Sequence, residues 1–444
     1  MKNRELVFVI ITVLVLSCLT VAGPARPGKR GDFYDRYETL SHIVSHVADK
    51  YVEDVDAEKL FYGAYKGMLQ TLDPHSAFLP PARKKDLEVE TKGEFGGLGI
   101  EITLDKLGVL TVVAPLEGSP AFRAGVLAGD RIIKIEGKST KGISLREAVN
   151  KLRGPKGKPV TITVLHESGK SEDIEVTRDI IKLESVKDPR FVDDKAKIAY
   201  IRLSQFQKNS AESLDKAVKE LSDKGMKALV LDLRFNPGGL LASAIEVADR
   251  FLADGVIVST KGRKSPERIF KAKADGTYAK LPLAVLISGR SASASEIVAG
   301  AIQDHRRGVL VGTRTYGKAS VQTLIKLEGG RSAIRLTTAY YYTPSGRLIH
   351  RNVNKPDQEE WGIAPDIKVD VSLHEEVDLW NHWREEHRRK AREQNGEPEP
   401  KPKKKPIELD KDKKPEEPKE FHDKTLEAAV NALKVLLIDW ERGR

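Results

Sequence analysis

The chain has 444 residues, of which 40% are hydrophobic and 32% charged, and its formal net charge is +10. At about 150 residues per domain this length allows about three domains, and the composition excludes collagen and a protein of many membrane spans. The single cysteine, Cys18, excludes an internal disulfide, cysteine-based zinc sites, iron–sulfur clusters and redox dithiols.

The N-terminus has the pattern of an export signal. Lys2 and Arg4 precede an uncharged apolar run over Leu6–Leu19, and small residues follow. We therefore expect residues 1–23 to be a signal peptide that is removed after export to the periplasm or another extracytoplasmic compartment. Two alternatives stay open. One is a retained membrane anchor, although the apolar run is shorter than the about 20 residues of a span. The other is a lipoprotein signal with lipid on Cys18.

The next two regions differ in their periodicity. Apolar residues recur at helical spacing from Tyr34 to Leu72, within an N-terminal helical segment over residues 24–92. Two short helices cannot bury a core alone, so we expect them to pack on another part of the protein. Residues 93–181 then read as short strands and turns around one amphipathic helix that Ser144 caps, which predicts a small domain.

Residues 182–370 alternate fully apolar strands with helices. The predicted strands begin at Ile198, Ala228, Leu283 and Val309, and helices follow the first three. Apolar strands separated by helices predict an α/β core whose sheet is covered on both faces.

The C-terminal region has a different composition. Residues 371–423 are expected to form a charged, largely disordered tether, because from Arg384 to Glu420 there are 13 basic residues, 11 acidic residues and six prolines. Residues 424–444 return to a helical pattern with one apolar stripe. We expect this helix and residues 34–72 to pack away from the sheet of the α/β core and to help form a homodimer.

Three loops at strand ends carry candidate chemistry. In Ser288–Ser295 a buried strand runs into small residues and a helix, where a serine lies near the positive end of the helix dipole. The turn Leu231–Gly239 ends a second buried strand in Pro-Gly-Gly and presents free backbone N–H groups, as an oxyanion hole requires. The structural alternative for Ser288–Ser295 is a serine that only caps the helix, next to small packing residues. The alternative for Leu231–Gly239 is an ordinary strand–turn–helix connection, in which glycine serves steric needs.

The third loop contains Lys318 and Gln322. A lysine in an apolar pocket loses proton affinity, and its neutral amine can take the proton from a serine. Gln322, four residues further on, can orient that amine. The alternative is an exposed lysine on a loop.

The three loops together, with several further motifs, give a specific pattern. The chain resembles the C-terminal processing peptidases, also called tail-specific proteases, a Ser–Lys family with an inserted PDZ domain. The motifs that carry the resemblance are Gly96–Ile100, Gly118–Gly137, Leu152–Gly157, Leu231–Leu241, Ser291–Asp304, Gly312–Gln322, Tyr341–Ile349 and Gly362–Ile367.

The resemblance implies a role for individual residues. Ser293 is expected to be the nucleophile, Lys318 the general base and Gln322 the residue that orients it. The backbone N–H groups of Gly238 or Gly239 and of Ala294 would form the oxyanion hole. Residues Leu98, Gly99 and Ile100 match the loop of a PDZ domain that binds a peptide carboxylate, and Arg153 is the candidate contact that reports an occupied PDZ groove to the catalytic region.

The resemblance also implies the architecture. It predicts a multidomain α/β protein with N-terminal helices over 24–92, a PDZ domain over 93–181 and a ClpP/crotonase-like α/β peptidase core over 182–370. The charged tether and the terminal helix follow this core. Relatives mostly end soon after the core, so this C-terminal region departs from the family pattern.

The expected activity is that of an exported serine endopeptidase that binds the C-terminal tails of its protein substrates. Neither a cofactor nor a metal is expected, and no metal-ligand spacing is found among the ten histidines. Nucleic acid is not expected as a partner, because the basic residues of the tether alternate with acidic ones. The alternative is a catalytically silent PDZ scaffold that only binds tails.

Overall fold

The computed structural model describes residues 30–442 apart from 106, 117, 167, 265, 274–277, 353–359 and 395–420. The expected signal peptide and Cys18 therefore lie outside the described residues. Among the helices described, none combines the length and the apolar character that a membrane span requires. The chain divides into two compact units, Met1–Asp73 and Pro74–Arg444.

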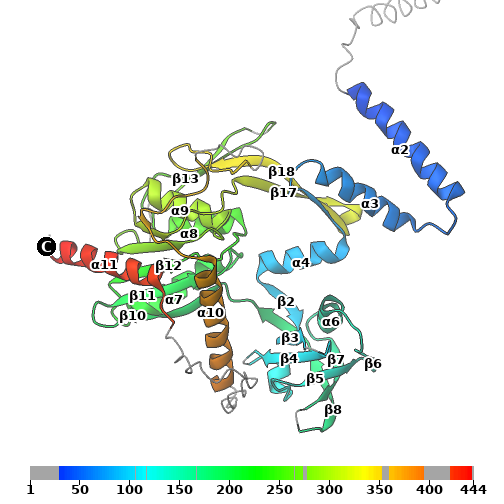
Figure 1. Cartoon of the computed structure of the whole chain (residues 1–444), viewed down its shortest axis with the longest axis horizontal. Helices are drawn as coiled ribbons and strands as arrows, with labels where there is room; N and C mark the ends of the chain where they lie inside the picture. Colours follow the sequence, from blue (N-terminus) through cyan, green and yellow to red (C-terminus); the bar gives the residue numbers. More distant parts are fainter. Residues whose placement is uncertain are drawn as a thin grey trace, which may run out of the picture. The chain divides into compact units, whose positions relative to one another are not determined.

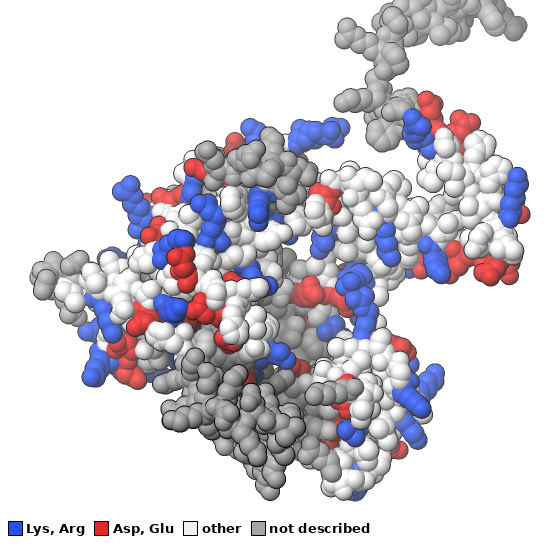
Figure 2. Space-filling model, in the orientation of Figure 1, with Lys and Arg blue, Asp and Glu red and all other residues white. Residues whose placement is uncertain are grey.

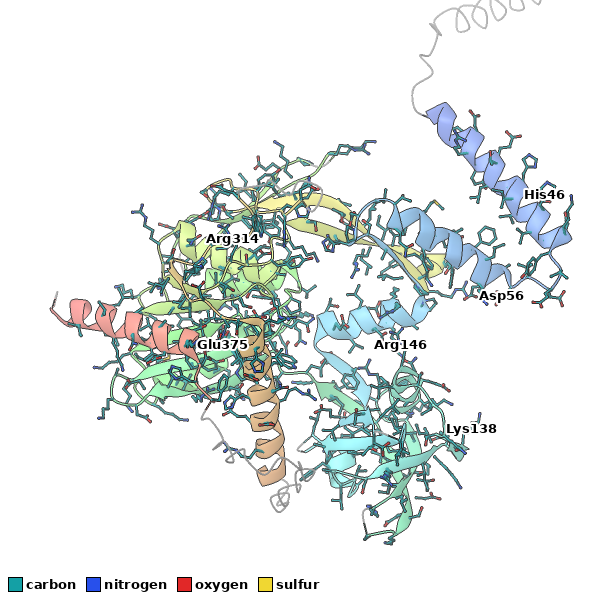
Figure 3. The ribbon with its side chains drawn as sticks, in the orientation of Figure 1. His46, Asp56, Lys138, Arg146, Arg314 and Glu375 are labelled. Atoms are coloured by element: carbon teal, nitrogen blue, oxygen red, sulfur yellow. The ribbon has the colours of Figure 1, made fainter. Side chains whose placement is uncertain are left out.

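The first unit contains the two expected N-terminal helices. They are α2 (Arg30–Lys50) and α3 (Ala57–Gln70). Asp56, labelled in Figure 3, caps α3 by accepting a hydrogen bond from the Lys59 N–H at 3.0 Å. No residue of α3 is buried, and Tyr34 and Tyr37 of α2 are also largely exposed.

The PDZ domain is inserted into the second unit through a two-stranded ribbon (Figure 1). In the ribbon β2 (Glu94–Gly97) pairs with β9 (Asp179–Lys182). Between them lie β3 (Ile100–Leu104), β4 (Leu110–Pro115), α5 (Pro120–Arg123), β5 (Arg131–Ile135), β6 (Lys138–Ser139), α6 (Leu145–Leu152), β7 (Pro159–Leu165) and β8 (Ser171–Thr177). The domain has its own buried core. Ser144 caps α6 as expected, accepting a hydrogen bond from the Glu147 N–H.

The peptidase core is built on a six-stranded sheet in the order β10-β11-β12-β15-β16-β19. Its strands are β10 (Val186–Asp193), β11 (Ile198–Leu203), β12 (Ala228–Asp232), β15 (Leu283–Ile287), β16 (Val309–Gly312) and β19 (Ile367–Lys368). The strands from β11 onward are parallel, so the carboxyl ends of β12, β15 and β16 lie at one edge. The loops at this edge carry all three candidate motifs.

Three helices pack on one face of this sheet. They are α7 (Ser210–Ser222), α8 (Leu241–Asp249) and α9 (Ala294–Asp304), and together with the sheet they form the largest buried apolar cluster. A second sheet borders the core in the order β1-β18-β13-β14, with β17 paired to β18. Its strands are β1 (Ala77–Leu79), β13 (Val256–Lys261), β14 (Arg268–Lys271), β17 (Ser320–Leu327) and β18 (Ser332–Tyr342), and a short 3-10 turn over Glu328–Gly330 joins the last two. Helix α4 (Pro81–Lys92) links β1 to the PDZ domain.

The terminal helix corrects one prediction. Helix α11 (Lys424–Arg442) packs directly on the catalytic sheet instead of away from it, and its Ala429, Leu433 and Leu437 are buried against β11, β12, β15 and β16. A parallel sheet needs both faces covered, and α11 covers the face opposite α7, α8 and α9. The stripe was identified correctly, but its partner was not.

The start of the expected tether is a helix. Helix α10 (Leu373–Gln394) occupies the start of the segment that composition assigned to a disordered tether. The side chains of Leu379 and Trp383, both on this highly charged helix, are buried. They provide apolar contacts that the overall composition of the segment does not reveal. The remainder of the expected tether lies outside the described residues, apart from residues 421–423.

Charged side chains of both signs cover the surface. On the face drawn in Figure 2, basic and acidic side chains are interspersed over the core and the PDZ domain. The net charge of +10 is therefore not gathered into one basic patch on this face.

Candidate active site

Ser293 lies where the buried strand β15 gives way to α9. It precedes the first residue of α9 and has φ 55° and ψ −113°, which is unusual for a residue with a side chain. Its neighbours Ser291 and Ser295 are fully buried, and their hydroxyls donate to the backbone carbonyls of Leu233 and Asn236 at 2.8 and 2.9 Å. Ser293 is only half-buried. Of these three serines, it is the one that a substrate can reach.

A buried carboxylate connects the loop of Ser293 with the loop of Lys318. Glu296 is fully buried, and its Oε1 accepts hydrogen bonds from the Thr315 hydroxyl and the Gly317 N–H, both at 2.6 Å. Its Oε2 accepts from the backbone N–H groups of Ser293 and Lys318, both at 2.8 Å. Burial raises the pKa of Glu296 above its ordinary value, against the opposing effect of these four donors.

Lys318 lies beside Ser293 because the two share hydrogen-bond partners. Their backbone nitrogens donate to the same oxygen of Glu296, so these two nitrogens lie within two hydrogen-bond lengths of each other. The buried hydroxyl of Tyr341 donates to the carbonyl oxygens of both residues, at 3.1 Å for Ser293 and 2.8 Å for Lys318. The structure thus places the backbones of Ser293, the expected nucleophile, and Lys318, the expected base, side by side.

Gln322 lies on the neighbouring hairpin. It belongs to β17, next to an irregularity in the pairing with β18. Its Nε2 donates to the hydroxyls of Ser320 at 2.9 Å and Thr337 at 3.3 Å. In this arrangement the amide of Gln322 is engaged within the hairpin, and its expected orienting role toward Lys318 is not visible in these contacts.

The Pro-Gly-Gly turn lies against Ser293. A Cβ added to Gly238, which has φ 105°, would lie 2.8 Å from Ser293 Cβ and 3.0 Å from the Ala294 nitrogen. Only glycine allows this close approach. The turn is held by the buried Asn236, whose Nδ2 donates to the Leu203 carbonyl at 2.7 Å and whose backbone oxygen accepts from the Ala292 N–H at 3.0 Å.

The three expected oxyanion donors are not equivalent. The N–H of Gly238 already donates to Asn236 Oδ1 at 2.9 Å. Within the described residues, the N–H groups of Gly239 and Ala294 donate no hydrogen bond. The turn therefore leaves Gly239 and Ala294 as the pair of donors available to an oxyanion.

The expected carboxylate-binding loop lies between β2 and β3. Gly99 has φ 74°, and its carbonyl accepts from the Leu116 N–H at 2.8 Å and the Ser119 hydroxyl at 3.0 Å. The Leu98 side chain is buried in the PDZ core, and its carbonyl accepts from the Ala121 N–H. Among the described residues, the N–H groups of Leu98 and Gly99 donate no hydrogen bond, as a loop that captures a carboxylate requires.

Arg153 lies where the PDZ domain meets α4. Its guanidinium lies 4.3 Å from the ring centroid of Phe95, and its Nη1 lies 3.9 Å from Asp86 Oδ1. Arg153, Phe95 and α4 also line a pocket of about 350 Å³. The arginine is thus packed between elements and does not simply project into solvent.

Sequence reasoning missed three organising residues: Glu296, Asn236 and Tyr341. Glu296 had a usable signal, since a serine followed three residues later by glutamate is the spacing of a capping box. Tyr341 acts through contacts with residues distant in the sequence, whereas Asn236 combines such contacts with a local one to the Gly238 N–H. Among the described residues, no group of His, Cys, Asp or Glu is arranged to hold a metal ion.

Family models match three parts of the chain. The model described as peptidase family S41 matches residues 197–369, and a PDZ domain model matches residues 111–165. A third, described as the N-terminal domain of the activating protease CtpB, matches residues 27–81.

Similar proteins extend the match to most of the chain. A carboxy-terminal-processing protease of Bartonella bacilliformis is 45% identical over 381 residues, covering 84% of this chain and 84% of that protein. A carboxyl-terminal-processing protease of Picosynechococcus is 40% identical, and the match covers 69% of this chain and 72% of that protein. Among solved structures, the photosystem II D1 C-terminal processing protease is 31% identical with a TM-score of 0.43, covering 75% of this chain and 87% of that one.

Proposed function

Because the chain belongs to the carboxyl-terminal processing proteases of peptidase family S41, we propose that it is an exported serine endopeptidase with a Ser–Lys mechanism. In this proposal the PDZ domain binds the C-terminal tail of a protein substrate, and the peptidase core cleaves that substrate through an acyl-enzyme. The observation that carries the mechanism is the shared acceptor Glu296 Oε2, which holds Ser293 and Lys318 together.

Each residue of the site has a part in the reaction. The neutral amine of Lys318 removes the proton from the Ser293 hydroxyl as its oxygen attacks the scissile carbonyl. The resulting oxyanion accepts hydrogen bonds from the N–H groups of Gly239 and Ala294. Lys318 then gives its proton to the leaving amine. Water, activated by the neutral amine of Lys318, then hydrolyses the Ser293 ester and regenerates the enzyme.

Substrate selection follows from the PDZ domain. The tail carboxylate binds to the N–H groups of the loop over Leu98–Ile100, and the tail adds a strand beside β3. A domain inserted through a ribbon can change its position relative to the core, so an occupied groove can influence the site. Arg153, at the ribbon and against α4, is our candidate for the contact that reports tail binding. Gln322 remains the candidate for orienting Lys318 when substrate is bound.

Location and assembly are further parts of the proposal. The charged start and apolar run of residues 1–23 support export to the periplasm or a comparable compartment, with cleavage favoured over lipid attachment at Cys18 or a retained anchor. Helices α2 and α3 expose apolar side chains, including Tyr34, Ile43 and Met68, which supports a homodimer through these helices. Light scattering at micromolar concentration tests this, and a strictly monomeric mass contradicts it.

The competing function is a PDZ scaffold that binds tails without cleaving them. Both functions predict tail binding, so the decisive difference is turnover. The conjunction of a reachable serine, a lysine beside it and two unengaged N–H donors favours the enzyme.

The test uses an unfolded protein substrate in two forms, one with an apolar C-terminal tail and one with that tail amidated. We expect the purified protein to cleave the first form much faster than the second. Ser293→Ala abolishes cleavage, whereas Ser222→Ala, an exposed serine at the end of α7, retains it. Cleavage by folded Ser293→Ala contradicts the assignment, and tail binding without any cleavage by the wild type favours the scaffold.

A further inference from the structure

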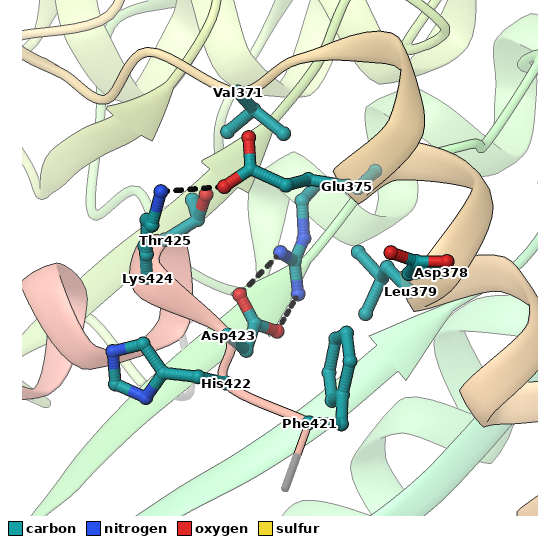
Figure 4. A pocket seen from close by; sticks show the side chains of 10 residues that line it. Val371, Glu375, Asp378, Leu379, Phe421, His422, Asp423, Lys424 and Thr425 are labelled. Carbon is teal, nitrogen blue, oxygen red and sulfur yellow. Dashed lines mark hydrogen bonds and ion pairs between the residues drawn. The ribbon is translucent and has the colours of Figure 1, made fainter. Parts of the chain in front are cut away.

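A buried ion pair joins the C-terminal region to the turn over Leu231–Gly239, which carries an expected oxyanion donor and is called the oxyanion turn below. Arg234 is the second residue after β12 and is 5% exposed. Its two Nη atoms donate to the two carboxylate oxygens of Asp423 at 2.8 and 2.7 Å, as Figure 4 shows. The same guanidinium donates to Asp232 from Nε at 3.0 Å and from Nη2 at 2.7 Å. Arg234 is thus clamped between a carboxylate of the sheet and one from a residue 189 positions later.

The charges in this cluster depend on one another. Burial alone lowers the pKa of Arg234, but Asp232 and Asp423 outweigh it and raise this pKa above its ordinary value. Burial raises the pKa of Asp423, and Arg234 outweighs it and holds this pKa below its ordinary value. Removing the Asp423 carboxylate therefore leaves Arg234 paired with Asp232 alone and frees one side of the guanidinium to move.

Helix α10 holds the next residue of the same turn. Phe235 has φ 59°, a conformation that a bulky side chain adopts only when its surroundings impose it. Its ring packs against Trp380 and Trp383, each with a centroid distance of 5.6 Å. Trp383 is buried, so this aromatic contact is part of the packed interior.

The same helix also reaches the nucleophile loop. Glu376 of α10 accepts from Nε of Arg290 at 3.1 Å, and Arg290 lies three residues before Ser293. Lys424 at the start of α11 pairs with Glu375 of α10, which joins the two helices (Figure 4). The loop that contains Ser293 and the turn over Leu231–Gly239 are therefore both attached to the C-terminal region.

We propose that α10 and the segment from Phe421 to the end of α11, together named the C-terminal strap, are a positioning element of the active site. Asp423 fixes Arg234, and α10 fixes Phe235 and Arg290, so that the Gly239 and Ala294 N–H groups converge on one oxyanion. The catalytic consequence rests on the proposed function. Asp423 acts through Arg234 and is a positioning residue, not a catalytic one.

The experiment compares two anchors of the same helix. Asp423→Asn breaks the anchor at the oxyanion turn. Lys434→Gln breaks a second ion pair of α11, from Lys434 Nζ to Asp193 Oδ2 at 2.7 Å on β10, which touches neither catalytic loop. Turnover is measured with a short chromogenic peptide ester that carries no recognition tail, so that tail binding does not enter.

We expect Asp423→Asn to lower kcat at least about tenfold while KM stays within about twofold, because oxyanion stabilisation is lost without loss of ground-state binding. Asp423→Glu, which restores the carboxylate, should recover most of that loss. Lys434→Gln should keep kcat within about twofold of the wild type. An unchanged kcat in Asp423→Asn, or an equal loss in Lys434→Gln, overturns the proposal.

Two further measurements keep the proposal open to refutation. If Asp423→Asn does not fold, Glu376→Gln tests the partly exposed anchor on Arg290, and an unchanged kcat there overturns the proposal. Hydrogen exchange over residues 233–241 needs no activity. We expect it to be at least about fivefold faster in Asp423→Asn and unchanged in Lys434→Gln, because local opening follows lost anchoring. Equal exchange in both variants overturns the proposal that the C-terminal strap positions the turn. Because this measurement needs no cleavage, it can refute the strap independently of the proposed protease function.

Discussion

Replacing Glu296 with glutamine keeps the size of the side chain but removes one hydrogen-bond acceptor. The amide NH₂ must face one of two pairs of donors: the Ser293 and Lys318 N–H groups, or the Thr315 hydroxyl and the Gly317 N–H. The second orientation is less costly, since a hydroxyl can accept a hydrogen bond from the NH₂. Even then, the Gly317 N–H loses its acceptor.

The magnitude follows from the two buried donors that lose their acceptor, the Gly317 N–H and the Thr315 hydroxyl proton. A buried donor left without a partner costs about 1–3 kcal/mol, so the free energy of unfolding of the core should fall by at least about that amount. Gly317 immediately precedes Lys318, and a small displacement of a catalytic group can lower the rate strongly. We therefore expect kcat for a short peptide ester to fall about 10- to 100-fold, with KM within about twofold.

Denaturation followed by tryptophan fluorescence reports the core alone, because all four tryptophans lie outside the PDZ domain. The matched control is Asp130→Asn, which alters a buried PDZ carboxylate that accepts from the Leu127 N–H and contacts His166. This control should leave ester turnover within about twofold of the wild type. A normal kcat in Glu296→Gln, or an undiminished free energy of unfolding, refutes the role assigned to this carboxylate.

Three other substitution effects follow from the same structure. Gly99→Ala places a Cβ 2.3 Å from Ser119 Cβ at a positive φ, so affinity for a fluorescent tail peptide should fall at least about tenfold; unchanged anisotropy titrations contradict the loop assignment. Arg153→Ala should lower turnover of tailed substrates about tenfold while tail affinity stays within about twofold, and unchanged turnover excludes the reporting role. Because burial raises the pKa of Glu296 above 4.5, the native state binds a proton at higher pH than the unfolded chain and gains stability on acidification. The stability deficit of Glu296→Gln relative to the wild type should therefore grow as the pH falls from neutral toward 4.5, and paired denaturation curves showing a constant deficit contradict this.

Local patterns predicted the elements that carry their own signals. Helix α9 lies where the sequence predicted a helix, after the strand that begins at Leu283, because it follows an apolar strand and begins after a run of small residues. The loop positions followed as well, since parallel strands place their carboxyl ends at one edge of a sheet. The pairing of Ser293 with Lys318 was expected from the resemblance to the C-terminal processing peptidases, and the position of both loops at one edge of the sheet agrees with it.

What the sequence hid depends on tertiary contacts. The apolar stripe of α11 shows which face is buried but not what covers it, and the covering surface is the catalytic sheet itself. Helix α10 has so many charged residues that the buried side chains of Leu379 and Trp383 do not produce a periodic signal. The pairing of Arg234 with Asp423 is likewise invisible, because no local spacing connects residues so far apart.

Trapping the acyl-enzyme tests the central claim most directly. The protein is mixed with an activated peptide ester and quenched in acid during turnover, and the acyl group is located by tandem mass spectrometry of the peptide that spans residues 291–306. The account predicts the acyl group on Ser293, its absence in Ser293→Ala, and strongly reduced acylation in folded Lys318→Ala. An acyl group on Ser291, Ser295 or any other residue, or turnover that persists in Ser293→Ala, contradicts it.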